Sequence, residues 1–521
     1  MRKANNIVQL SLTGITLSFF ILWIILNNLL KEKYDLWNIL ELIALYLIYI
    51  SIKRFPYKYT FLWLLTLRGI IEIAIVLLQF SGIMESNHSF FKITGTFHNP
   101  GPLGGFMAII FLATVGLSLK YKQKKYFSIC LLVLTICNGI VLILSDSRSG
   151  WLAAIIGALY LFWNKTQWNA WSRITKVASI FIILLFSTTL YFHKKDSADG
   201  RILIWKVTCH MIAEQPLSGH GNNSFSEKYM YHQARFFESH PSSKYMQYAD
   251  SVSYPFNEML HLWVENGLIA IILALWILYS LSYRAESEED KTLIALLLAI
   301  CTFSMTSYPS YIDEFKILFI FLLGLTKSKV YYSFKISVFH EKIFCVITFL
   351  LGIGLFSFKY YKKLEMESYL QMIYQTPSCD TGLDCNNYIK TNYHNLLNVP
   401  ELFYLYAIYS CQYHKTPDNK IVLENAIQKV PSPILLCNFA ALYKQEKNYN
   451  KAIQILRTAQ YMLPYHIRPK YELFLLYRDI GKQDEAMRII KDAMAIPIKT
   501  YNTSALKMRG EMNRYYNKFH H

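Results

Sequence analysis

The chain has 521 residues, of which 53% are hydrophobic and 16% aromatic, and its formal net charge is +18. An apolar fraction this high, concentrated in long runs, excludes an ordinary soluble protein and a disordered one. The basic residues are spread among many short loops and form no single block, so the charge does not indicate a nucleic-acid-binding protein.

Eleven apolar runs predict membrane-spanning helices, because about 20 apolar residues cross the hydrocarbon layer of a bilayer. The expected spans are residues 7–30, 36–52, 59–82, 103–119, 126–145, 150–163, 174–192, 257–282, 292–308, 315–326 and 343–358. Two of them, 150–163 and 315–326, are short for a complete crossing. The first run is not followed by a small-residue cleavage site, which favours a retained anchor over a signal peptide.

Lysine and arginine are concentrated in alternate connections between these runs. The basic connections are 53–58, 120–125, 164–173, 284–291 and 327–335. The other set comprises 83–102, 145–150, 193–256 and 308–314. Because basic loops remain in the cytoplasm, this pattern predicts a cytoplasmic amino terminus and places the large loop 193–256 outside, together with the carboxyl-terminal tail.

The tail changes in composition from about residue 360 and contains an internal repeat. Residues 442–464 align with 476–498 at an offset of 34, so that Tyr443 corresponds to Tyr477 and Ala452 to Ala486. This period is typical of tetratricopeptide repeats, whose paired helices meet at small residues. A weaker copy begins near residue 409, and an unrelated array of helical hairpins is the alternative.

The expected fold is therefore all-α, with two domains. Residues 1–359 form a polytopic membrane bundle of about eleven helices that carries the large outer loop 193–256. Residues 360–521 form a helical-repeat domain on the outer side. Stacked helix pairs present a concave surface, so we expect this domain to position an acceptor or a protein partner.

The nine cysteines indicate a compartment rather than a metal site. Cys379 and Cys385 lie close together in the predicted outer tail, where a disulfide would suit an oxidising periplasm, although spacing alone does not establish one. The chain has no CxxC pair. We expect neither a bound metal nor another cofactor.

Polar chemistry is concentrated in three stretches that the topology places outside: "SDSRSG" (145–150), "GRILIWKVTCHMIAEQPLSGHGNNSF" (200–225) and "FNEMLHLWVENGLIA" (256–270). Arg148 and Arg201, with a turn that exposes the backbone N–H groups of Gly219 and Gly221, would suit a phosphorylated lipid, because guanidinium groups bind phosphate through paired hydrogen bonds. The alternative is that both arginines only extend to lipid headgroups.

These stretches, preceded by "GTFHNPGPLGGF" (95–106), resemble in their order the O-antigen ligase and O-antigen polymerase superfamily. The resemblance implies a GT-C membrane glycosyltransferase at the periplasmic face of a bacterial inner membrane. Such an enzyme transfers a glycan from undecaprenyl pyrophosphate to lipid A core, a growing glycan or a protein hydroxyl, without a metal. Tetratricopeptide-like tails occur in some members, especially those similar to protein O-oligosaccharyltransferases.

By this resemblance Arg148 and Arg201 hold the donor pyrophosphate. Many ligases carry a histidine where this chain has Phe256, and that departure weakens the ligase assignment relative to a polymerase. The nearest imidazole is His261, predicted to act as general base, with Glu258 the next candidate. Asn257 and Glu265 share its helix face and are expected to orient it. The alternative is that His261 is a polar residue satisfied within the bundle.

Arg68 and Glu72 are four residues apart in the third expected span and are predicted to form a structural ion pair. The alternative, a proton or substrate path, would favour a lipid-glycan transporter. A membrane-anchored scaffold that displays the repeats is a third class of protein, after the glycosyltransferase and the transporter. It would leave the outer motifs without a role.

Overall fold

The computed structural model describes residues 5–54, 58–162, 194–281, 287–375, 393–397, 399–413, 418–497 and 503–520, together with 172, 188, 189, 191 and 192. Contacts between residues divide the chain into two compact units. Unit 1 comprises residues 1–194 and 256–358, and unit 2 comprises 195–255 and 359–521. The expected span 174–192 and the cysteines Cys379 and Cys385 lie outside the described residues, apart from the few positions named above.

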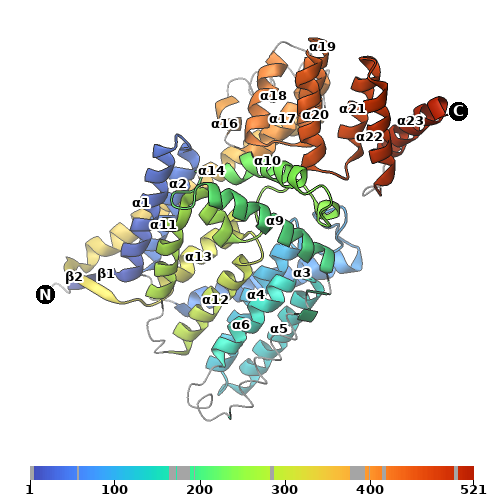
Figure 1. The fold of residues 1–521 in the computed structure, drawn as a ribbon. Coiled ribbons are helices and arrows are strands. Elements are labelled where there is room, and N and C mark those ends of the chain that lie inside the picture. Colours follow the sequence, from blue (N-terminus) through green and yellow to red (C-terminus); the bar gives the residue numbers. More distant parts are fainter. Residues whose placement is uncertain are drawn as a thin grey trace. The chain divides into compact units, whose positions relative to one another are not determined.

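Unit 1 is largely a bundle of helices (Figure 1). Its helices are α1 (Leu12–Leu30), α2 (Leu36–Ile52), α3 (Lys58–Ser81), α4 (Pro100–Lys120), α5 (Lys125–Leu144), α6 (Arg148–Leu161), α11 (Glu258–Ser280), α12 (Glu288–Ser304), η2 (Pro309–Tyr311), α13 (Asp313–Leu325) and the first part of α14 (Val338–Gln375).

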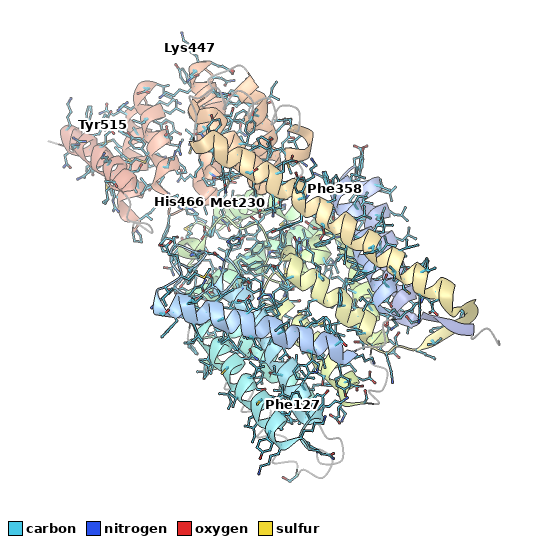
Figure 2. All side chains as sticks on the ribbon, turned by 180° about the vertical axis from the view of Figure 1, so that it is seen from behind. Phe127, Met230, Phe358, Lys447, His466 and Tyr515 are labelled. Carbon is cyan, nitrogen blue, oxygen red and sulfur yellow. The ribbon has the colours of Figure 1, made fainter. Side chains whose placement is uncertain are left out.

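The predicted all-α polytopic class is confirmed. Among the described residues, six helices are long and apolar enough to cross a membrane: Leu12–Leu30, Lys58–Ser81, Pro100–Lys120, Lys125–Leu144, Glu258–Ser280 and Glu341–Gln371. Helices α2 and α6 are apolar but shorter. The run at 343–358 is part of α14, which continues to Gln375 without a break (Phe358 is labelled in Figure 2).

A small antiparallel sheet changes two of the segments predicted from the sequence, the first span and the basic connection 327–335. Strand β1 (Asn5–Ser11) pairs with strand β2 (Val330–Ser337), with Val8 opposite Phe334. The first span therefore begins at Leu12 and not at residue 7, and the basic segment 327–335 is largely strand. Apolar periodicity near the amino terminus does not reveal such a pairing, because the partner strand lies more than 300 residues away.

Helix α4 is the central helix of unit 1, whereas α5 and α14 lie at its surface. In the most apolar window of α4, 83% of the residues are buried, against 28% in α5 and 11% in α14. The exposed apolar side chains of α5 recur every three or four residues: Ile129, Leu132, Val133, Ile136, Ile140 and Ile143. An apolar stripe of this extent is unfavourable in water and natural against lipid tails.

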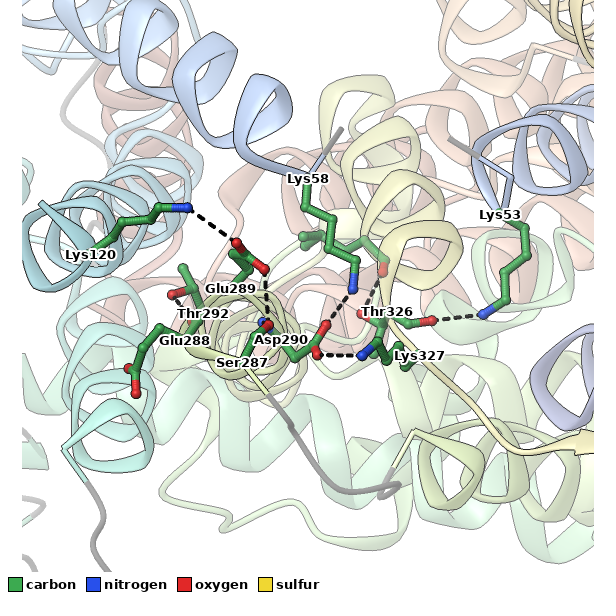
Figure 3. Close-up of polar contacts among 11 residues, drawn as sticks. Lys53, Lys58, Lys120, Ser287, Glu288, Glu289, Asp290, Thr292, Thr326 and Lys327 are labelled. Atoms are coloured by element: carbon green, nitrogen blue, oxygen red, sulfur yellow. Dashed lines mark hydrogen bonds and ion pairs between the residues drawn. The ribbon is translucent and has the colours of Figure 1, made fainter. Parts of the chain in front are cut away.

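Charged side chains near several helix termini contact one another at one end of unit 1, here called the Lys58 end (Figure 3). Asp290, near the start of α12, is almost fully buried and contacts both Lys58 and Lys327. Lys120, at the end of α4, contacts Glu289 at 3.3 Å. The structure thus brings together parts of four of the five predicted basic connections, as the alternating topology requires.

The helices described in unit 2 are α9 (Lys195–Glu214), α10 (Ser224–Ser239), η1 (Met246–Tyr248), the end of α14, α16 (Tyr393–Leu397), α17 (Pro400–Tyr413), α18 (Asp418–Lys429), α19 (Pro433–Gln445), α20 (Tyr449–Met462), α21 (Ile467–Asp479), α22 (Gln483–Ala495) and α23 (Thr503–His520).

The repeat in the sequence is matched by two helix pairs. Helices α19 and α21 begin 34 residues apart, as do α20 and α22. The small residues where the helices pack are completely buried: Ala452, Ala459, Ala486 and Ala493. The assignment of these pairs to the tetratricopeptide class stays a prediction.

Candidate active site

Arg148 is the first residue of α6, directly after a tight turn. Asp146 has φ of 49°, a left-handed conformation that reverses the chain between α5 and α6 within three residues. The side chain of Ser147 caps α6 by accepting the N–H of Gly150 at 3.3 Å. Arg148 is half-buried and donates to the backbone carbonyl of Lys194 at 3.2 Å, while Lys194 contacts the Asp146 carboxylate at 2.5 Å.

Two glycines allow α4 and α6 to touch at this turn. A Cβ atom on Gly150 would lie 2.5 Å from the backbone carbonyl of Gly104, closer than any real contact. The Ser147 hydroxyl also donates to the carbonyl of Gly101 at 3.2 Å. The motifs 95–106 and 145–150 therefore pack in direct contact through Gly104 and Gly150. This packing fixes the position of Arg148 at the start of α6.

The connection before α4 is anchored to α3, and the predicted ion pair is confirmed. Arg68 contacts Glu72 at 2.7 Å. Glu72 is fully buried and also accepts the N–H of Thr96 at 3.1 Å. Gln79, two turns further along α3, holds both N–H and C=O of Gly95. Because these partners satisfy the Glu72 carboxylate, the pair has a structural role.

Asn257 is the N-cap residue of helix α11. Its side-chain oxygen accepts the N–H of Leu260 at 3.1 Å, so Asn257 starts the helix. Phe256, at the position where many ligases have histidine, has φ of 53° and packs its ring edge-on against Tyr308.

His261 lies between two carboxylates of its own helix. Its Nδ1 is 3.6 Å from Oε2 of Glu258, and its Nε2 is 3.3 Å from Oε1 of Glu265. The hydroxyl of Tyr311 lies 3.2 Å from the same Nε2. The His261 side chain is 15% exposed, so the cluster is shielded but still accessible. Two carboxylates this close stabilise the imidazolium form of His261, which is the form that a histidine base reaches once it has taken a proton.

The segment between α12 and α13 connects Arg148's helix to this cluster. Thr306 donates its hydroxyl to Ser149 at 2.8 Å. Ser310 donates its N–H and its hydroxyl to the two oxygens of Glu258, at 2.9 and 2.7 Å. The starts of α6, α11 and α13 therefore meet at the end of unit 1 opposite the Lys58 end, here called the Arg148 end.

Ser310 and Tyr311 were not predicted as site residues. Their only signal was the polar segment 308–314 between two apolar runs on the predicted outer side. Glu258, His261 and Glu265 were predicted together and are in contact. With both oxygens bonded to Ser310, Glu258 anchors the segment 306–311, which leaves Glu265 as the less committed carboxylate.

A break in α11 follows the cluster directly. Gly267 has φ of 76° and ψ of −177°, a conformation that is essentially restricted to glycine. The neighbouring carbonyl of Asn266 accepts the indole N–H of Trp23 at 2.9 Å, and the Asn266 amide accepts from Asn28 at 3.3 Å. Irregular backbone inside a membrane bundle requires such internal partners.

Gly267→Ala is expected to destabilise the protein by about 1–3 kcal/mol, because alanine cannot adopt this conformation without strain. Thermal unfolding of the purified protein in detergent measures the effect. Gly354→Ala, on α14 with open space around its Cβ position, is the matched control and should be neutral or slightly stabilising. Equal melting temperatures for wild type and Gly267→Ala would contradict the strain at Gly267.

Arg201 and the glycine-rich segment belong to unit 2. Helix α9 begins at Lys195, so Arg201 lies in its second turn and not at the helix start. Gly219 and Gly221 have φ of 65° and 90°, but both are buried, and Gly219 donates its N–H to the carbonyl of Gln215 at 3.0 Å. The expected turn of exposed N–H groups is therefore wrong. The roles of Arg201, Gly219 and Gly221 in donor binding stay predictions.

Two histidines of the large loop are buried structural residues. His220 contacts the carbonyl of Met211 through Nε2 at 2.8 Å and the Lys228 ammonium through Nδ1 at 2.9 Å. Burial lowers the pKa of His232 to about 4, against the opposing effect of Glu214 at 3.6 Å. Both imidazoles are therefore engaged by partners within unit 2.

The fold and the site define a polytopic membrane protein with an arginine and an imidazole–carboxylate cluster at one end of its bundle. Residues 130–275 match the family model described as O-antigen ligase. The resemblance to the O-antigen ligase superfamily is thereby confirmed for this part of the chain, which includes Arg148, Arg201 and His261. A comparison with curated proteins finds no match.

Proposed function

We propose that the protein transfers a glycan from an undecaprenyl-pyrophosphate-linked donor to an acceptor hydroxyl at the periplasmic face of the bacterial inner membrane. The observation that carries the proposal is the gathering of Arg148 and the His261 cluster at one end of unit 1, within the region similar to O-antigen ligase. The lipid bilayer and a lipid-linked glycan are its partners.

The donor pyrophosphate is assigned to Arg148 and Arg201. The Arg148 guanidinium stands at the amino end of α6, where the helix dipole also attracts an anion. As the glycosyl bond breaks, negative charge accumulates on the departing pyrophosphate, so fixed positive groups stabilise the transition state more than the ground state.

The acceptor hydroxyl is assigned to the His261 cluster. The oxygen of the acceptor hydroxyl forms a bond to the anomeric carbon of the donor glycan. At the same time the bond from that carbon to the pyrophosphate oxygen breaks. The hydroxyl proton passes to His261, and undecaprenyl pyrophosphate leaves with the bonding electron pair. Glu265 stabilises the imidazolium, and Glu258 holds the neighbouring segment in place. The reaction as proposed requires no metal.

The acceptor class is tested by the surface glycans of a strain that lacks the gene. Loss of long-chain lipopolysaccharide with intact glycoproteins would support the proposed ligase activity. Glycan attached as single repeats on lipid A core would identify a polymerase, and loss of glycoproteins alone would identify a protein O-oligosaccharyltransferase. Loss of the surface glycan, with the lipid-linked donor accumulating in the cytoplasmic leaflet, would favour a transporter.

The proposed topology predicts that both the large loop and the tail lie in the periplasm. Alkaline phosphatase fused near residue 230 or at residue 521 should be active, because this reporter folds only outside the cytoplasm, and fluorescent-protein fusions at the same positions should be dark. A fusion after residue 122, at the Lys58 end of unit 1, serves as the cytoplasmic control. Opposite results at residues 230 and 521 would reject the eleven-span topology.

A further inference from the structure

Helix α10 is buried on most of its surface although it belongs to a large polar loop. The buried residues are Ser224, Phe225, Glu227, Tyr229, Met230, His232, Gln233, Ala234 and Phe237, and Met230 is labelled in Figure 2. Five of them, Ser224, Phe225, Tyr229, Gln233 and Phe237, have no exposed surface. A loop helix buried to this extent must pack against something on more than one side.

The carboxyl-terminal helices cover one side of α10, which packs against α18 and α20. Two polar contacts fix this packing across more than 200 residues of sequence. Glu227, 6% exposed, contacts the Lys429 ammonium at the end of α18 at 2.9 Å. The amide of Gln233 donates to the carbonyl of Met462 at the end of α20 at 2.7 Å, and its oxygen accepts from Tyr229.

Helix α9 covers another side of α10 and fixes the segment between the two helices. Glu214, at the end of α9, contacts His232 and Arg235 of α10. His220, inside the segment, bonds to Met211 of α9 and to Lys228 of α10. The segment 215–223 is therefore tied through His220 to both α9 and α10.

From these contacts we infer that the carboxyl-terminal helices hold α10 and thereby position the segment 215–223, whose Gly219 and Gly221 are predicted to take part in binding the lipid-linked donor. Glu227 and Gln233 are positioning residues, since they act through α10 and not on the donor itself. The inference rests on the proposed function for the donor. It gives the tail a role within the enzyme's own fold, in addition to the acceptor or partner surface expected from the sequence.

A charge exchange tests the inference in the purified full-length protein. Glu227→Lys should increase hydrogen exchange in residues 215–239 and weaken binding of undecaprenyl pyrophosphate roughly tenfold, since a buried cation would face Lys429. Transfer should show a higher KM for the donor at nearly unchanged kcat. The double variant Glu227→Lys/Lys429→Glu should restore exchange protection and binding together.

The control is the same exchange at Lys420 and Glu446, an exposed pair of unit 2 that links α18 to the residue after α19. It should change neither exchange in 215–239 nor lipid binding. Loss of protection in Glu227→Lys with unchanged binding would overturn the inference, as would a folded double variant without rescue. If the wild type itself does not bind undecaprenyl pyrophosphate, the proposed function fails, while the exchange data still decide whether the tail holds α10.

Discussion

Arg148→Lys and Arg148→Ala are both expected to lose most transfer activity. Removing a hydrogen bond to a charged group costs about 1.5–3 kcal/mol, or roughly 10- to 150-fold, and more if the charge develops in the transition state. Lysine should not rescue, because a point charge does not reproduce the paired hydrogen bonds of a guanidinium group on phosphate. The measurement is transfer from purified undecaprenyl-pyrophosphate-linked glycan at matched levels of folded protein.

The matched control is Arg54→Lys. Arg54 pairs with Glu341 at 3.4 Å and is far in sequence from the O-antigen ligase region, so its replacement should leave transfer nearly normal. If Arg148 served only to anchor a helix end at the lipid headgroups, lysine would do so equally well. Near-normal transfer by Arg148→Lys would therefore reject the pyrophosphate contact.

His261→Ala is expected to reduce kcat by about 10²–10⁴-fold with little change in donor KM, which is the usual contribution of a general base. Glu265→Gln should give a smaller loss, since the imidazolium loses its charged neighbour but the base remains. Steady-state kinetics with varied donor concentration separate the effect on kcat from the effect on the donor KM.

Tyr311→Phe is the conservative comparison for this cluster. It removes only the hydroxyl that lies 3.2 Å from Nε2 and keeps the ring packed on the imidazole, with centroids 5.3 Å apart. We expect a mild effect. A His261→Ala variant with normal kcat would show that the imidazole is a satisfied polar residue of the bundle, and Glu258 would then be the next base to test.

Local patterns in the sequence predicted the features that depend on neighbouring residues. Apolar runs located the helices of the bundle, the four-residue spacing gave the Arg68–Glu72 pair, and the offset of 34 located the paired helices α19 to α22. The group of Glu258, His261 and Glu265 followed from helix periodicity for the same reason.

The features that were missed depend on residues far apart in the chain. Tyr311 reaches His261 from a different segment, and α10 is held by Lys429 and Met462 across more than 200 residues. The exposure of Gly219 was predicted wrongly because glycine-rich composition indicates an unusual backbone but not whether the fold covers it.

The pairing of β1 with β2 has a consequence for how the protein is made. More than 300 residues separate the two strands, so at about 5–20 residues per second the ribosome needs roughly 15–60 s after finishing the first before the second emerges. During that interval β1 has an open edge that invites pairing with another chain. Chains truncated before residue 330 would keep this edge permanently and should be more prone to aggregate than chains truncated after residue 337.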